Sequence, residues 1–553
     1  MNSKKVWKWI YQNGKNTIPL IILLTTLSII LSLISLSFAM VSKEVFDIAT
    51  NQLSGNLLKS CANLVLLLLL QLIIHILISF INVHANTKME IDMKRNIFKN
   101  LISKDFLSIS KYHSGELLNR LTSDVSIIVS GIITIIPSAA LLLTTLIGSF
   151  CYLYFLEPFF ALLILCVGPF ILISSRFYSK KYKQLHKDCQ NADGKVRSFM
   201  QEALQNLIVI KSFSNQDDVL DHNEFLQKNS YRFRIKRVKI SLLAHICMYI
   251  ALNAGYYFAI AYCAVKLSMS AMTFGTVSAI LQLVNKIQSP FKDISSLIPK
   301  FLSVSASAER ILELEALKQD FSEGNHVGRD IYKKIESIEF ENVNFSYDET
   351  PVLKNASFSI KKGEISVVGG QSGAGKSTAI KLILGIITPQ NGEIFARTID
   401  GGKLSLNNLT RSLFAYVPQG NLILSGTIRD NLIFGKKDAT DEELINACKT
   451  AQIWDLISSL ENGFDTELGE KGLGLSEGQV QRIAIARALL YAAPILLLDE
   501  STSALDEKTE GSLLKALKEM KDKTCIIISH KKAAFEICDN VIDYTKLNNK
   551  KEI

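Results

Sequence analysis

A glycine-rich segment in the middle of the chain has the residue types and spacing that bind phosphate. Gly370-Gln-Ser-Gly-Ala-Gly-Lys-Ser377 follows a run that predicts a strand, Ile365–Val368, and precedes one that predicts a helix, Thr378–Leu384. Glycines let backbone N–H groups converge on phosphate oxygens, and the helix adds the positive end of its dipole. We expect Lys376 to reach the β- and γ-phosphates and the Ser377 hydroxyl to bind Mg²⁺. The predicted phosphate-binding residues are Gly370, Gln371, Ser372, Gly373, Ala374, Gly375, Lys376, Ser377 and Thr378.

Two acids end a second apolar run, Ile495–Leu498, which also predicts a strand. Placing Asp499 and Glu500 at the carboxyl end of a buried strand costs free energy unless a cation or a ligand lies there. We therefore expect Asp499 to hold Mg²⁺ through water. Glu500 is the predicted general base, which orients or deprotonates the water that attacks the terminal phosphate.

The first 300 residues contain six apolar runs long enough to cross a bilayer, which takes about 20 residues. The third and fourth are separated by little more than Glu157-Pro158, a tight turn. Apolar residues make up 48% of the chain and charged residues only 20%, and these runs account for the bias. The predicted spans are 18–41, 61–83, 131–156, 159–175, 241–265 and 273–297.

Basic residues are concentrated in two of the connections between these runs. The connection 84–130 carries seven Lys or Arg, and the one between the fourth and fifth runs carries more, whereas the opposite connections carry only Lys43, Lys59 and Lys266. Basic loops stay on the cytoplasmic side, so we expect a multi-pass protein of the cell membrane with both termini and the soluble half in the cytoplasm. The net charge of +9 then faces anionic lipid, and we expect no nucleic-acid partner.

The sequence thus predicts an all-α six-helix transmembrane domain (1–316), a linker (317–334) and an α/β P-loop NTPase domain with a mainly parallel sheet (335–553). Both basic connections are too long for turns and rich in helix formers, so spans two to five should continue as helices beyond the membrane. A separate polar helix is expected to begin at Ala306. The nine cysteines lack metal-binding spacing and are expected to be reduced.

Several further motifs follow one another in a fixed order around the phosphate loop. With it, they resemble the ATP-binding cassette (ABC) family, and in particular its exporter-type (type IV fold) half-transporters, over nearly the whole chain. Thr466–Gly472 also resembles the exporter segment that contacts the transmembrane helices. The motifs are Phe345-Ser-Tyr347, Val417-Pro-Gln419, Leu475-Ser-Glu-Gly-Gln479, Ser503-Ala-Leu-Asp506 and Ile528-Ser-His530.

The resemblance implies an ABC ATPase that uses ATP and Mg²⁺. By resemblance, Tyr347 stacks on adenine, Gln419 senses Mg²⁺ and the attacking water, and His530 contacts the γ-phosphate. Ser476 and Gly478 would contact ATP held by the opposite subunit, with Gln479 and Asp506 also at the nucleotide. Two copies would then clamp two ATP molecules between them. ATP would bind the closed pair more tightly than the open pair, and this difference in affinity would drive the conformational change.

The partner implied by the resemblance is a second half-transporter in a membrane of lipid. All the motifs occur in one chain, which favours a homodimer, although a heterodimer with a degenerate partner also fits. Two departures stand out: Glu477 replaces the usual middle glycine of the signature motif, and the tail after His530 is short. A carboxylate near the γ-phosphate should weaken anion binding, but a helix N-terminus tolerates it.

Polar residues within the apolar runs predict either a substrate path or hydrogen bonds between helices. Gln71 and His75 in span two and Gln282 and Lys286 in span six are the candidates, with Lys286 suited to an acidic cargo. Lys111–Asp124 and Leu204–Phe213 resemble regions near the two coupling helices, although amphipathic packing gives the same pattern. The resemblance favours export of an amphipathic compound, peptide or lipid of unknown identity; an importer with the exporter fold and an ATP-gated regulator or channel are the alternatives.

Overall fold

The computed structural model describes residues 3–320, 324–348, 350–370, 375–420, 423–469, 474–520 and 522–544. These residues form two compact units. The helical unit consists of Met1–Asn100 and Ser114–Ala316, and the ATPase unit consists of Leu101–His113 and Leu317–Ile553. The boundary of the helical unit after Ala316 coincides with the predicted start of the linker.

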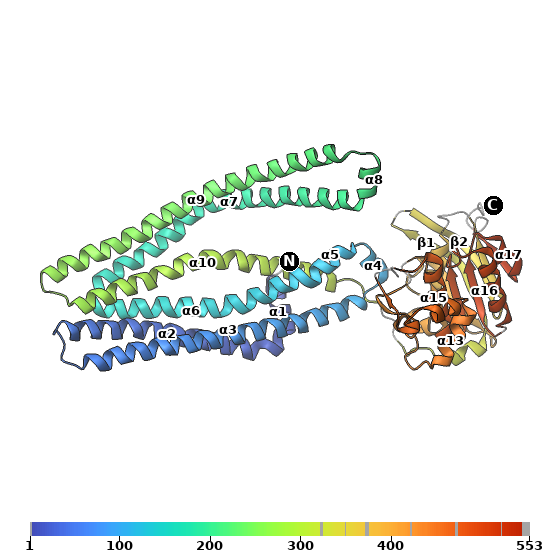
Figure 1. Cartoon of the computed structure of the whole chain (residues 1–553), viewed down its shortest axis with the longest axis horizontal. Coiled ribbons are helices and arrows are strands. Elements are labelled where there is room, and N and C mark those ends of the chain that lie inside the picture. Colours follow the sequence, from blue (N-terminus) through green and yellow to red (C-terminus); the bar gives the residue numbers. More distant parts are fainter. Residues whose placement is uncertain are drawn as a thin grey trace. The chain divides into compact units, whose positions relative to one another are not determined.

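Six long helices contain the six predicted spans, except that the sixth helix begins one residue later, at Phe274 (Figure 1). In the described part of the chain, four helical stretches are long and apolar enough to cross a membrane: Lys5–Ala49, Leu57–Ile102, Ser114–Leu156 and Tyr249–Ser268. The fourth and sixth spans remain predictions. The long helices are α2 (Ile18–Ala49), α3 (Leu57–Ile102), α6 (Val125–Leu156), α7 (Pro158–Gln205), α9 (Gln216–Ser268) and α10 (Phe274–Glu315).

The predicted extension of the spans into long helices is also found. Helices α7 and α9 run side by side and are joined by the short helix α8 (Leu207–Ser212) (Figure 1). Shorter elements complete the unit: α1 (Ser3–Gly14), the 3-10 turn η1 (Lys15–Thr17), α5 (Ser114–Asn119) and the π-helical turn η2 (Arg120–Asp124).

The prediction of a separate polar helix from Ala306 is wrong, because α10 runs unbroken from Phe274 to Glu315 through Pro290 and Pro299. Each proline removes one backbone hydrogen bond. Packing of α10 against α6, α2 and α9 holds the helix together in spite of this loss.

One buried carboxylate joins the start of α6 to the end of α10. Asp124 is 1% exposed and accepts hydrogen bonds from the Ser307 hydroxyl (2.9 Å) and from Arg310 Nε (2.8 Å). A second link joins α1 to the end of α10: Trp9 Nε1 donates to Glu315 Oε2 at 2.7 Å. Both contacts involve the last turns of α10, so polar side chains hold the end of this helix against α1 and the start of α6.

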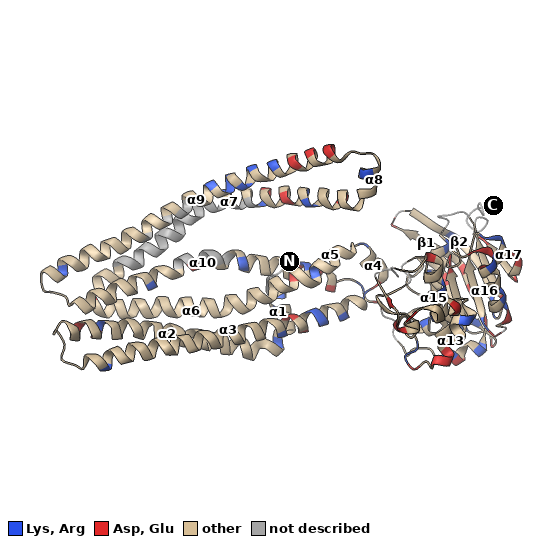
Figure 2. Cartoon of the chain, viewed as in Figure 1, with Lys and Arg blue, Asp and Glu red and all other residues tan. Residues whose placement is uncertain are grey.

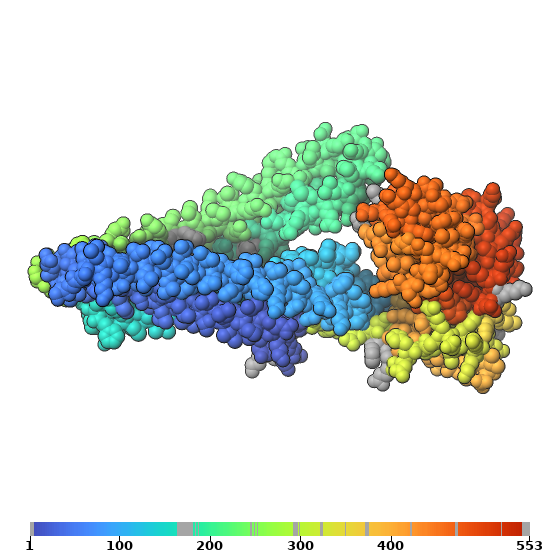
Figure 3. Space-filling model, turned by 60° about the horizontal axis from the view of Figure 1, so that its bottom comes forward, coloured from blue at the N-terminus to red at the C-terminus, as the bar shows by residue number. Residues whose placement is uncertain are grey.

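Charge is distributed along the helical unit as a membrane protein requires. Figure 2 shows few charged residues along α2 and α6, whereas Lys, Arg, Asp and Glu gather along α7 and α9 towards α8. The apolar part of α3 lies on the surface of the unit, where Figure 3 shows it as a continuous blue face. Leu66 and Phe80 there are 64% and 74% exposed, which suits contact with lipid or with another chain.

The ATPase unit contains a parallel sheet and an antiparallel sheet. The predicted parallel core is confirmed: five strands lie in the order β11-β3-β10-β9-β6, with every pair parallel. They are β3 (Ile365–Gly369), β6 (Phe414–Val417), β9 (Ile495–Asp499), β10 (Thr524–Ile528) and β11 (Asn540–Asp543). Strand β11 shows that the short tail after His530 still supplies an edge strand.

The antiparallel sheet, in the order β2-β1-β4-β5, was not predicted. Its strands are β1 (Ile335–Tyr347), β2 (Thr350–Lys361), β4 (Asn391–Thr398) and β5 (Lys403–Ser405). A core that includes Phe340, Phe345 and Ile394 packs between it and the parallel sheet.

Helices and turns complete the ATPase unit. Its helices are α11 (Lys376–Ile383), α12 (Ile428–Leu432), α13 (Asp441–Thr450), α14 (Trp454–Ser459), α15 (Glu477–Leu490), α16 (Glu507–Glu519) and α17 (Lys532–Ile537). The 3-10 turns are η3 (Arg329–Lys334), η4 (Asn408–Leu413) and η5 (Gly463–Asp465), and β7 (Gly426–Thr427) pairs with β8 (Glu467–Leu468).

The segment Leu101–His113, which contains α4 (Phe106–Ser110), belongs to the ATPase unit. Lys104 Nζ donates to the Leu317 carbonyl at 3.0 Å, and the Lys381 ammonium lies 5.4 Å from the centre of the Phe106 ring. Lys111 forms an ion pair with Asp348 at 3.8 Å. Helix α4 therefore lies directly before Lys111–Asp124, the region predicted to be near a coupling helix.

Candidate functional site

The phosphate loop connects β3 to α11, as the sequence predicts. Strand β3 is buried along its whole length, so its carboxyl end is fixed within the parallel sheet. Gly370 and Gly375 have φ values of +140° and +91°, which L side chains rarely adopt, and this explains two of the glycines. A Cβ atom on Gly375 would lie 2.2 Å from Val352 Cγ1. The predicted loop residues Gln371, Ser372, Gly373 and Ala374 lie outside the described residues.

Lys376, the first residue of α11, is 5% exposed and lies among polar groups from three loops. Its ammonium donates to the Gly370 carbonyl at 2.8 Å and lies 2.8 Å from His530 Nε2. A neutral imidazole protonated at Nδ1 can accept that bond. Burial lowers the pKa of Lys376, and the carboxylates of Glu500 and Asp499 oppose this effect. A buried cation of this kind is suited to a phosphate group.

Ser377 and Asp499 lie together, as expected of a magnesium site. Ser377 Oγ donates to Asp499 Oδ1 at 3.0 Å, and Tyr416 Oη donates to Asp499 Oδ2 at 3.3 Å. Burial raises the pKa of Asp499, which is 2% exposed, although the two hydrogen bonds counteract this. A hydroxyl and a buried carboxylate are oxygen ligands of the type that Mg²⁺ prefers, so the residues fit the ion.

Glu500 lies between Gln419 and His530. Gln419 Nε2 donates to Glu500 Oε2 at 2.7 Å, and His530 Nε2 lies 3.5 Å from Glu500 Oε1. Glu500 has a φ of +47°, in the left-handed region, and its N–H donates to the Ile528 carbonyl at 3.0 Å. Such backbone conformations cluster at functional sites. The three predicted catalytic residues therefore converge at one edge of the sheet, beside Lys376.

Tyr347 ends β1 close to this group. Its ring packs edge-on against Phe345, with centroids 4.9 Å apart, and Thr378 Oγ1 donates to its hydroxyl at 3.5 Å. The aromatic residue predicted to stack on adenine thus lies beside the helix that begins with Lys376.

The signature residues form a second group at the start of α15. Ser476 is the N-cap, and a capping box joins it to Gln479: Gln479 N–H donates to Ser476 Oγ at 3.3 Å, and Ser476 N–H donates to Gln479 Oε1 at 2.8 Å. Glu477 lies in the first turn, where the helix dipole favours a negative charge. This arrangement explains how α15 accommodates Glu477 in place of the usual middle glycine of the signature motif.

Two partly buried contacts hold the segment that contains Asp506, and residue spacing does not predict them. Gln481, on α15, donates to Ser503 Oγ at 3.1 Å and accepts from the Ala504 N–H at 3.1 Å. A Cβ atom on Gly478 would lie 2.7 Å from the Ala504 carbonyl oxygen, so only glycine fits there without movement. Gln481 is 4% exposed, and a polar amide that precedes Arg482 and the apolar run 483–486 was the available signal.

The second contact comes from Lys531, the residue after His530. Its ammonium donates to the carbonyls of Thr502 (2.8 Å) and Leu505 (2.7 Å) and pairs with Glu510 at 3.3 Å. Asp506 follows as the N-cap of α16, and its side chain accepts from the Thr509 N–H at 3.0 Å. Hydrogen bonds from the Thr509 side chain and then from its N–H lower the pKa of Asp506. Lys531 therefore holds the segment after His530 against the turn that leads to Asp506.

The structure does not gather the four predicted path residues. Lys286 on α10 donates to the Ser35 carbonyl and, at 2.7 Å, to the Ser35 hydroxyl on α2. Gln282 donates to Ser278 on its own helix at 3.3 Å, while His75 is exposed on α3. The contacts of Lys286 favour the alternative of hydrogen bonds between helices, and a role in transport remains a prediction.

Comparisons with known proteins cover both units. The ABC transporter transmembrane region family matches residues 21–291, and the ABC transporter family matches residues 353–503. ABC transporter B family member 1 of Dictyostelium discoideum is 30% identical over 544 residues; the match covers 95% of this chain and 58% of that protein. The ATP-dependent lipid A-core flippase of Pasteurella multocida (strain Pm70) is 30% identical over 467 residues, 81% of this chain and 78% of that protein.

The fold is shared with a solved transporter. The structure of a bacterial Atm1-family ABC exporter with ATP bound aligns with a TM-score of 0.80 and 23% identity, covering 96% of this chain and 94% of that chain. The geometry, the family matches and the relatives agree on both units. The chain belongs to the ABC transporter family, as an exporter-type half-transporter with a transmembrane region and an ATPase domain fused in one chain.

Proposed function

We propose that two such chains hydrolyse ATP at their shared interface and use it to export an amphipathic compound, peptide or lipid from the cytoplasm by alternating access. The observation that carries the proposal is the convergence of Lys376, Gln419, Glu500 and His530 at one edge of the parallel sheet. The lipid A-core flippase among the relatives favours an amphipathic cargo. The charge distribution supports a location in the cell membrane with both termini in the cytoplasm.

Each residue has a defined part in hydrolysis. Lys376 and the N-terminus of α11 bind the phosphates, and Tyr347 stacks on adenine. Ser377, Asp499 and Gln419 would hold Mg²⁺, which offsets negative charge on the phosphates. Glu500 takes the proton of the attacking water while Gln419 orients its carboxylate, and His530 stabilises charge that develops on the γ-phosphate.

Measurements of turnover and of ATP binding distinguish the role of Glu500 from that of Lys376. In the purified full-length protein in lipid, Glu500→Gln should keep ATP affinity and lower turnover by roughly 10²–10⁴-fold. Lys376→Ala should lose binding as well, and Lys532→Ala, an exposed lysine on α17, serves as the control. Parental turnover in Glu500→Gln would refute its role as the base.

Mixing two inactive chains tests the shared interface. If Ser476 acts on ATP held by a partner, Lys376→Ala and Ser476→Ala homodimers are both inactive. A mixture then regains activity, because one of the two sites in each mixed dimer combines an intact phosphate loop with an intact Ser476. Failure to regain activity, with mixed dimers demonstrated by affinity tags, would contradict the shared site. Robust turnover by a single type of chain supports the homodimer over a heterodimer.

The direction of cargo transport is tested with membrane vesicles in both orientations. An exporter accumulates cargo in inside-out vesicles supplied with external ATP, an importer depletes it, and an ATP-gated channel passes ions without cargo. Candidate cargoes are first chosen by their stimulation of ATPase activity, with Glu500→Gln as the inactive control. Lys286→Ala tests the substrate path: unchanged cargo affinity and rate would exclude Lys286.

A further inference from the structure

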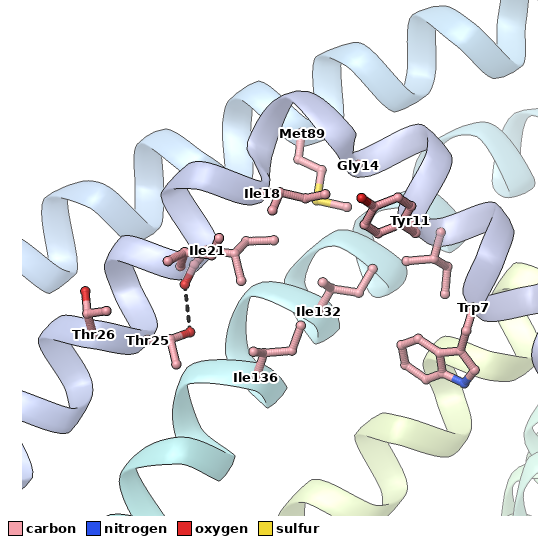
Figure 4. Close-up of a pocket in the computed structure, with 12 residues that line it drawn as sticks. Trp7, Tyr11, Gly14, Ile18, Ile21, Thr25, Thr26, Met89, Ile132 and Ile136 are labelled. Atoms are coloured by element: carbon pink, nitrogen blue, oxygen red, sulfur yellow. Dashed lines mark hydrogen bonds between the residues drawn. The ribbon is translucent and has the colours of Figure 1, made fainter.

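The helical unit contains a cavity of about 460 Å³ beneath its N-terminal helix (Figure 4). This elbow cavity lies between α1, the start of α2 and single faces of α3 and α6. Its size falls in the roughly 300–1,000 Å³ range of sites for small molecules. It is lined by Trp7, Ile10, Tyr11, Gly14, Ile18, Ile21, Ile22, Thr25, Thr26, Met89, Ile132 and Ile136.

The lining suits a hydrocarbon chain. Isoleucine is the commonest lining residue, and the Thr25 hydroxyl is occupied because it donates to the Ile21 carbonyl at 2.7 Å (Figure 4). Gly14 lets α1 approach α3, since a Cβ atom there would lie 2.9 Å from Met89 Cε. A pocket with so apolar a lining offers few hydrogen-bond partners to water and favours apolar ligands.

The cavity also lies where the chain enters the predicted membrane. Helix α1 buries Val6, Trp9 and Ile10 against the rest of the unit and exposes Lys5 and Lys8. A helix with one apolar and one basic face lies at a membrane surface. The first predicted span begins at Ile18, which itself lines the cavity.

Three exposed lysines lie next to lining residues of the cavity in the sequence. Lys8, Lys15 and Lys88 are each exposed and each adjoins a lining residue in the sequence: Trp7, Gly14 and Met89. On α3, Glu90 is offset by its ion pair with Lys94 at 2.6 Å, whereas Asp92 accepts a hydrogen bond from the neutral Asn16 at 3.5 Å, so the three lysines outnumber the one remaining acid. The rim is therefore positive, which complements an anionic headgroup.

We propose that the elbow cavity binds one acyl chain of an anionic glycerophospholipid, with the headgroup phosphate at Lys8 and Lys15. Nothing in the proposed transport cycle requires this site, and the bound lipid differs from a cargo in that it remains with α1. The apolar cavity provides affinity for the acyl chain, and the lysines provide selectivity for the anionic headgroup.

Quenching of Trp7 fluorescence tests the proposal, because Trp7 lines the cavity. The chain has three tryptophans, so Trp9→Phe and Trp454→Phe leave Trp7 as the single reporter in the full-length protein. In bilayers of phosphatidylcholine, phosphatidylglycerol with brominated acyl chains should quench Trp7 more than brominated phosphatidylcholine at the same mole fraction. Replacing Lys8 and Lys15 by Gln should lower the relative affinity for the anionic lipid roughly ten-fold.

Filling the cavity gives the matched test. Ile136→Phe with Thr25→Leu should abolish the excess quenching, whereas Leu143→Phe, on the exposed face of α6 outside the lining, should preserve it. Lys59→Gln, at the other end of α3, is the charge control. ATPase activity reports that each variant is folded.

Three outcomes would overturn the proposal. Equal quenching by the two lipids would mean that Trp7 only meets bulk lipid. Excess quenching that survives filling of the cavity would locate the lipid elsewhere. Quenching by a brominated free fatty acid with none by the phospholipid would identify a different ligand. Failure of ATP-driven transport with the lipid preference intact would refute only the proposed function.

Discussion

Removal of the Lys531 ammonium should destabilise the ATPase unit. Glu510 is 1% exposed and Lys531 is its ion-pair partner, while the carbonyls of Thr502 and Leu505 accept from the same lysine. Lys531→Met leaves a buried carboxylate and two carbonyls without that donor. Breaking a fully buried pair costs roughly 3–5 kcal/mol. The Lys531 side chain is 32% exposed, so water relieves part of the loss, and we expect about 3 kcal/mol in total.

Thermal unfolding of the full-length protein measures this loss. With Trp7 and Trp9 replaced by Phe, Trp454 is the single tryptophan and reports on the ATPase unit, where its ring lies 5.6 Å from Phe464. A loss of about 3 kcal/mol corresponds to a Tm lower by roughly 6–12 °C for a unit of this size. Lys532→Met is the matched control: the neighbouring lysine is exposed, and its replacement should change stability by less than about 0.5 kcal/mol.

A double-mutant cycle separates the ion pair from the loss of packing. Removing the carboxylate as well, in Lys531→Met with Glu510→Leu, should recover about 1.5 kcal/mol, because no buried charge is left unpaired. The reasoning is refuted if Lys531→Met melts with the parent protein, or if the double variant melts no higher than Lys531→Met.

Three further predictions concern the nucleotide site. Asp499→Asn should raise the Tm of the nucleotide-free protein at neutral pH while abolishing Mg²⁺-dependent hydrolysis. Burial raises the pKa of Asp499 above 3.8, so the contribution of this carboxyl to stability is fully present below pH 3.8 and is lost as the pH rises through the pKa of the folded state. Its Tm gain should vanish in acid, and a gain independent of pH would exclude this explanation. Tyr347→Ala should weaken ATP binding roughly ten-fold or more and Tyr347→Phe should not, by nucleotide titration; equal losses would point to the hydroxyl instead of stacking. Glu477→Gln should tighten ATP-dependent dimerisation and cost up to about 1 kcal/mol of stability, since a charge leaves the first turn of α15; unchanged ATP dependence would show that this carboxylate stays away from the phosphate.

The chemistry of the ATPase unit could be predicted from the sequence because local segments encode it. Lys376 follows a glycine-rich loop and Glu500 ends an apolar run, and both patterns depend only on neighbours in the chain. Their meeting with His530 follows from strand order, since β3, β10 and β9 are adjacent and parallel. The carboxyl ends of such strands share one edge of the sheet.

The supporting contacts could not be predicted in this way. Lys531, which follows His530, reaches Glu510 on α16, and Gln481 on α15 reaches Ala504 in the turn between β9 and α16. Neither pairing has a signature in spacing. In the helical unit, α10 passes through Pro299 because it packs against its neighbours, whereas the sequence around this proline by itself suggests a break. Tertiary packing decided these features.

The backbone of Glu500 places a limit on how this position can vary. A left-handed φ of +47° is unfavourable for a residue with a Cβ atom and acceptable for glycine, so a glycine there would relax the turn while deleting the carboxylate. Branched side chains would make the same turn harder to form. Selection for stability and selection for turnover therefore oppose each other at a single residue, and drift towards a more stable, inactive ATPase is one substitution away.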